Sequence, residues 1–101
     1  MRGQPAILIS LSAAVLLFSM NAGQGAANLG QKCSAIEPCA RGLWCDPEPD
    51  HCGVAGEGTC VKVRQVCFGR HPLVCGCNSR TYPNDCQRIR RKIAKKHDGR
   101  C

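Results

Sequence analysis

Residues 67–86 read CFGRHPLVCGCNSRTYPNDC, and the spacing within this stretch is the strongest indication of the fold. Counted from Cys67, the pattern is C-x7-C-x6-Y-x3-C. The run Pro83-Asn84-Asp85 is typical of a helix start, because proline and short polar residues favour the first helical positions. The stretch therefore predicts a small cross-linked unit that holds one exposed loop in a fixed shape.

Residues 1–27 have the features of a secretory signal peptide. Arg2 supplies a positive charge, the run from Ala6 to Phe18 is almost entirely apolar, and Gly25-Ala26-Ala27 offers the small residues that a signal peptidase reads. The apolar run is too short to span a bilayer. We predict cleavage after Ala27 and a secreted or periplasmic protein.

The chain beyond the predicted signal keeps all ten cysteines. An even cysteine number in an exported chain this short predicts five disulfides, which offset a core too small to be stable by itself. Zinc is the other role of clustered cysteines, but paired C-x2-C spacings are missing from the sequence. We expect a small disulfide-rich fold with no metal and no other cofactor.

Residues 28–63 are predicted to form a disulfide-rich hairpin subdomain. Glycine and proline recur too often between residues 33 and 60 for a helix, and two short strands fit, Gly42–Cys45 and Gly58–Val63. The segment Cys39-Ala-Arg-Gly-Leu-Trp-Cys45 followed by Gly58-Thr-Cys60 resembles the second half of the insulin-like growth factor-binding protein N-terminal module. The resemblance implies the pairs Cys33–Cys45 and Cys39–Cys60. The first half of that module is absent, so growth-factor binding is not implied.

Residues 64–101 resemble a Kazal-type serine protease inhibitor domain. The match is carried by Cys67, Val74-Cys75-Gly76, Thr81-Tyr82, Asn84, Cys86 and Gly99-Arg100-Cys101. It implies an α+β unit with a small antiparallel sheet and one helix. It also implies the disulfides Cys67–Cys86 and Cys75–Cys101.

Two departures from the Kazal pattern concern the cysteines. The family's first and fifth cysteines form a pair, but the positions expected for the fifth hold Ile89 and Arg90. Cys77 stands where the family usually has a small polar residue. Once the four implied pairs are assigned, Cys52 and Cys77 remain. By elimination we expect them to join and to link the two subdomains.

The regular structure expected in this second part is one helix and two short strands. The helix is predicted over residues 84–97, with Asn84 or Asp85 as its N-cap and Gly99 just beyond its end. The strands are expected at Leu73–Gly76 and Arg80–Tyr82, beneath the apolar face of the helix.

The exposed loop is the candidate functional site, and it consists of Phe68, Gly69, Arg70, His71, Pro72 and Leu73. The resemblance implies a protease inhibitor that presents a preorganised, substrate-like segment, which loses little conformational entropy on binding. In that family an asparagine at the position of Asn84 lies under the loop and hydrogen-bonds its carbonyls. Tyr82 is expected to support the loop from the core. The expected partner is a serine protease of the trypsin-like or subtilisin-like type.

The primary contact residue is open between two positions. The family places it two residues after the second cysteine, which here is Gly69, and a glycine fills no specificity pocket. Pro72 stands one residue earlier than the proline that the family usually has before its third cysteine, so the loop can be shifted. A shift would present Arg70 to a trypsin-like pocket that carries an acid.

A second hypothesis is a non-inhibitory binding module. The formal net charge of the chain is +7. At helical spacing, one solvent face would carry the cations of a basic face: Arg88, Arg91, Lys92, Lys95 and Lys96. Such a face would attract anionic partners in a salt-dependent way, although most charged faces only keep a protein in solution.

An enzymatic role is not indicated. The sequence contains no G-x-S-x-G elbow, no metal-ligand set and no phosphate-binding loop. We expect a monomer with no small-molecule substrate.

Overall fold

A computed structural model of the chain describes residues 25–53 and 56–101. The predicted signal peptide, residues 1–27, lies outside the described residues except for its last three. Ala27 is buried, with 6% of its surface exposed. Its N–H donates to the Pro38 carbonyl at 2.8 Å, and its own carbonyl accepts from the Ala40 N–H at 2.7 Å. A cut after Ala27 would remove both hydrogen bonds, whereas a cut before Ala27 would keep them.

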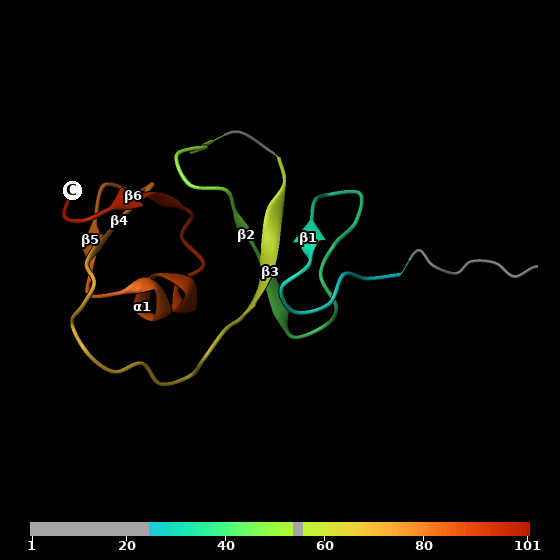
Figure 1. Cartoon of the computed structure of the whole chain (residues 1–101), viewed down its shortest axis with the longest axis horizontal. Helices are drawn as coiled ribbons and strands as arrows, with labels where there is room; N and C mark the ends of the chain where they lie inside the picture. Colours follow the sequence, from blue (N-terminus) through green and yellow to red (C-terminus); the bar gives the residue numbers. More distant parts are fainter. Residues whose placement is uncertain (1–24, 54–55) are drawn as a thin grey trace, which may run out of the picture.

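The first sheet is antiparallel and has the order β1-β3-β2 (Figure 1). Its strands are β1 (Lys32–Cys33), β2 (Leu43–Pro47) and β3 (Gly58–Lys62). The predicted hairpin is present, although β2 runs two residues further than expected. Pro47 is tolerated at its end because β2 is an edge strand, where a missing N–H breaks no ladder.

The second sheet is antiparallel too, with the order β5-β4-β6. The central strand β4 (Val74–Gly76) is buried along its whole length. It lies between β5 (Thr81–Tyr82) and β6 (Lys95–Asp98). The short helix α1 (Asp85–Arg90) lies between this sheet and strands β2 and β3 (Figure 1). Among the described residues, no helix is long and apolar enough to cross a membrane.

The prediction of a helix over residues 84–97 is wrong beyond Arg90. Arg91 is the C-cap of α1, and Lys92 follows with a φ of 55°, outside the helical region. Residues 95–98 form strand β6, which pairs with β4 in the register Val74↔Asp98. Gly99 therefore follows a strand and does not end a helix. Helix propensity is a weak preference, and pairing with the exposed edge of β4 outweighs it.

Five disulfides cross-link the chain: Cys33–Cys45, Cys39–Cys60, Cys52–Cys77, Cys67–Cys86 and Cys75–Cys101. These are the pairs expected from the two resemblances and from elimination. The sulfurs of Cys33, Cys39 and Cys60 lie within 4.8 Å of one another, so two disulfides pack together as the centre of the first core. Disulfides in this number suggest an oxidising extracellular or periplasmic setting.

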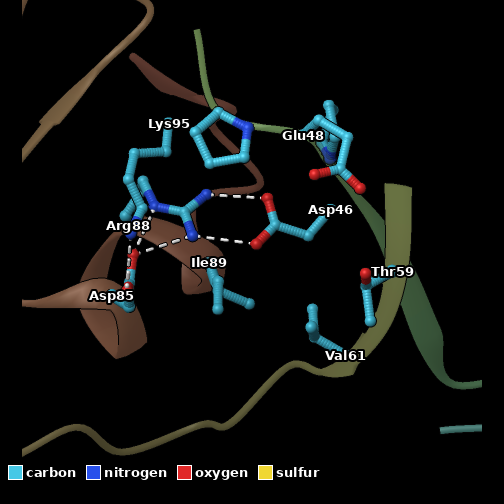
Figure 2. A pocket seen from close by; sticks show the side chains of 10 residues that line it. Asp46, Glu48, Thr59, Val61, Asp85, Arg88, Ile89 and Lys95 are labelled. Atoms are coloured by element: carbon cyan, nitrogen blue, oxygen red, sulfur yellow. Dashed lines mark hydrogen bonds and ion pairs between the residues drawn. The ribbon is translucent and has the colours of Figure 1, made fainter. Parts of the chain in front are cut away.

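Arg88 links the helix to the first sheet. Arg88 is 1% exposed, and its guanidinium donates from Nη1 and Nη2 to the two carboxylate oxygens of Asp46 on β2, both at 2.9 Å (Figure 2). Nε donates to Asp85 Oδ1 at 2.8 Å, and Nη1 also donates to the Ile93 carbonyl at 2.7 Å. Burial by itself would lower the pKa of Arg88, but the hydrogen bonds and charges of Asp46 and Asp85 raise it above its usual value.

Two further connections join the sheets. The Cys52–Cys77 disulfide ties the loop after β2 to the end of β4. Close by, the Asp50 N–H donates to the Lys95 carbonyl on β6 at 3.0 Å. The two sheets are therefore joined by a covalent bond and a backbone hydrogen bond in addition to the ion pair of Arg88 with Asp46.

We predict that Arg88→Ala lowers the free energy of unfolding by about 3–5 kcal/mol, because it leaves the Asp46 carboxylate without its partner at a largely buried site. The measurement is guanidinium chloride unfolding with the disulfides intact. Arg91→Ala is the control, since Arg91 is exposed and its loss should change the free energy by no more than about 0.5 kcal/mol. Equal effects of the two substitutions would contradict the structural role of Arg88.

Candidate functional site

The loop of residues 68–73 is fixed at both ends by the second sheet and the helix. At its start, Cys67 is bonded to Cys86 on α1. At its end, the Leu73 carbonyl accepts from the Gly99 N–H at 2.7 Å, and Cys75 is bonded to Cys101. Only a short arc between these anchors projects into solvent.

Asn84 fixes the loop from beneath. Its side-chain Nδ2 donates to the Phe68 carbonyl at 2.8 Å and to the Gly69 carbonyl at 3.0 Å. Its Oδ1 accepts from the Gln87 N–H at 3.0 Å, which makes Asn84 the N-cap of α1. The residue is 7% exposed. One buried amide thus uses its donor side for the loop and its acceptor side for the helix.

The side chains of the arc point outward. Phe68 is 84% exposed, and Arg70, His71 and Pro72 are exposed as well. Single exposed apolar side chains are common, but an exposed aromatic ring gives a partner surface a large apolar area to cover. The arc therefore offers one apolar and one cationic side chain close together on a backbone that is anchored on both sides.

Gly69 adopts a φ of +86°, in the left-handed region that L-residues with a side chain disfavour. Extended, substrate-like backbone has a negative φ, so the chain bends at Gly69. Arg70 comes directly after this bend. The peptide bond between His71 and Pro72 is cis.

Tyr82 lies in the core of the second sheet. It is buried on β5 opposite Val74, and its hydroxyl accepts from Asn78 Nδ2 at 2.8 Å. Leu73, the last loop residue, is half-buried beside this sheet. Both residues stabilise the platform from which the arc projects.

The predicted basic face does not exist as a single helical face. Arg88 is buried against Asp46, and Arg91 and Lys92 lie in the turn after α1. Lys95 and Lys96 belong to β6. The prediction depended on a helix through residue 97, and its five cations separate once the chain turns into a strand.

Lys95 is also engaged with acids. Its Nζ donates to Asp98 Oδ1 at 2.8 Å and to Asp85 Oδ2 at 3.2 Å. Burial acts to lower the pKa of Lys95, but these bonds raise it overall. The hydrogen bond from Lys95 lowers the pKa of the Asp98 carboxyl.

Sequence reasoning missed the pair Asp46–Arg88. Asp46 and Arg88 line the cleft between β2 and α1 together with Glu48, Ile89 and Lys95 (Figure 2). The sequence predicts that Arg88 faces solvent, because charged residues are rarely buried without a partner. Its partner, Asp46, is distant in the sequence. The one available signal was the disulfide expected between Cys52 and Cys77, which brings the two regions together.

We predict that Asn84→Asp loosens the loop while it keeps the helix cap. Aspartate can still accept from the Gln87 N–H, but it cannot donate to the two carbonyls. Two lost hydrogen bonds are worth about 1–3 kcal/mol, so trypsin should cut after Arg70 about 5–150 times faster. Mass spectrometry of the disulfide-intact protein measures the rate. Asn78→Asp is the control, because Asn78 bonds Tyr82 away from the loop. Unchanged cleavage in Asn84→Asp would refute the role given to this amide.

No protein-family model matches this chain, and no solved structure matches it at a significant level. The features that bear on function are the loop, the groups that hold it and the side chains that it exposes.

Proposed function

We propose that this protein is a serine protease inhibitor that acts through the disulfide-anchored loop of residues 68–73. The observation that carries the proposal is the pair of hydrogen bonds from Asn84 to the carbonyls of Phe68 and Gly69. They hold the backbone of an exposed arc from a buried side chain. The resemblance of residues 64–101 to a Kazal-type domain supports the same assignment.

A loop held in this way meets two physical requirements of an inhibitor. Fixing the backbone costs about 1–2 kcal/mol for each residue, and here folding has already met that cost before a protease binds. In addition, Cys67–Cys86 and Cys75–Cys101 keep both sides of the arc attached to the same platform. If the protease cuts the arc, the new ends stay close to each other, so less entropy is lost when the bond re-forms.

Arg70 is the residue that we assign to the specificity pocket. Gly69 has no side chain, and its positive φ departs from the extended form of a bound substrate. Arg70 is exposed directly after this bend. Its guanidinium suits a pocket with an acid at the base, so the target is a trypsin-like serine protease. Phe68, two residues before Arg70, then supplies an apolar contact beside the specificity pocket.

We predict that Arg70→Ala weakens inhibition of trypsin by about 30- to 1,000-fold, since truncation of a central interface residue costs about 2–4 kcal/mol. The measurement is the inhibition constant of the purified, disulfide-intact protein. Arg80→Ala is the matched control, because Arg80 is an exposed arginine in the turn before β5.

The same assay should include chymotrypsin-, elastase- and subtilisin-like enzymes. Inhibition of an elastase- or subtilisin-like enzyme that survives Arg70→Ala would return the primary contact to Gly69. Failure of the unmodified protein to inhibit any of the four classes would overturn the proposed function.

A further inference from the structure

The helix that holds the loop is itself held by the first sheet. Helix α1 has six residues, and a helix this short is not stable without external contacts. Its N-terminal half is tied to the loop through the Cys67–Cys86 disulfide, whereas its C-terminal half contains no cysteine. Its C-terminal half therefore needs a different attachment.

Arg88 provides this attachment. Its backbone N–H donates to the Asn84 carbonyl at 3.2 Å, in the first turn of α1. Its side chain ends in the two parallel hydrogen bonds to Asp46. A bidentate pair fixes direction as well as distance, because both groups are planar. The orientation of Asp46 thus sets the orientation of the turn that carries Asn84.

Asp46 is well placed to act as a fixed point. It pairs with Thr59 in the ladder between β2 and β3, and its neighbour Cys45 is bonded to Cys33. Both constraints belong to the first sheet and are independent of the loop. Movement of Asp46 relative to α1 would require the whole first sheet to move.

We propose that Asp46 is a positioning residue for the contact loop, acting through Arg88 and Asn84. The first sheet supplies this ion pair to the half of α1 that no disulfide holds. The effect of Asp46 on inhibition rests on the proposed function, but its effect on the loop does not.

The test compares Asp46→Asn with Glu48→Gln in the full, disulfide-intact chain. Asparagine keeps one oxygen for Nη1 but turns an N–H group toward Nη2, so the bidentate pair is lost. Glu48 lines the same cleft, and its carboxylate has no hydrogen bond or ion pair within the described residues. The readouts are the NMR signal of the Asn84 side-chain amide and the ¹⁵N order parameters of the Gly69 and Arg70 backbone amides.

In Asp46→Asn we expect the Asn84 amide signal to shift toward that of a free side chain and the order parameters of the two loop amides to fall below about 0.6. The inhibition constant for trypsin should weaken by about tenfold or more, mostly through faster dissociation. The Asn78 side-chain amide, bonded to Tyr82, serves as the internal reference and should not change. Glu48→Gln should leave every readout as it is.

A second variant covers the case in which Asp46→Asn does not reach the native disulfide pattern. Arg88→Lys keeps the charge, but an ammonium group cannot make two parallel bonds to one carboxylate. It should therefore release the loop in the same way. Native-like Asn84 and loop signals in either correctly folded variant would overturn the role of Asp46. If the unmodified protein inhibits no protease while these signals still respond, the proposed function fails and the positioning role stands.

Discussion

The fold depends on a buried arginine whose hydrogen bonds are supplied by three separate segments. Arg88 can lie out of water only because Asp46, Asp85 and the Ile93 carbonyl accept from its guanidinium. A buried charge with a missing partner is strongly destabilising. Strand β2, helix α1 and the turn before β6 must therefore assemble together, and this requirement gives the two sheets a defined arrangement.

Covalent bonds make such an arrangement possible in a chain with little core. The buried apolar residues of the described part are few, and half of them are cysteines: Ala27, Cys33, Cys60, Val74, Cys75 and Tyr82. The disulfides restrict the unfolded chain and so replace much of the hydrophobic stabilisation. The disulfides alone do not fix the orientation of α1 relative to the loop and to the first sheet. Hydrogen bonds fix this orientation: Asn84 donates to the loop, and Arg88 donates to Asp46 in the first sheet.

Much of this fold follows from local features of the sequence. The two resemblances implied four of the disulfide pairs and elimination gave Cys52–Cys77, while glycine and proline delimited the strands β2 and β3. The cap at Asn84 was also predictable, because it depends on its neighbour Gln87. The strand β6 was not, since residues 95–98 take their structure from β4, and a helical pattern of cations gave no sign of it. The burial of Arg88 was missed because Asp46 lies far away in the sequence, and the disulfide expected between Cys52 and Cys77 was the one sign that the two regions meet.

The central claim is that the exposed arc is rigid before any partner binds. It is tested most directly by ¹⁵N relaxation of the backbone amides of residues 68–71 in the oxidised, unbound protein. We predict order parameters close to those of strand β4, at about 0.8 or above. Values below about 0.6, with β4 remaining rigid, would contradict the account.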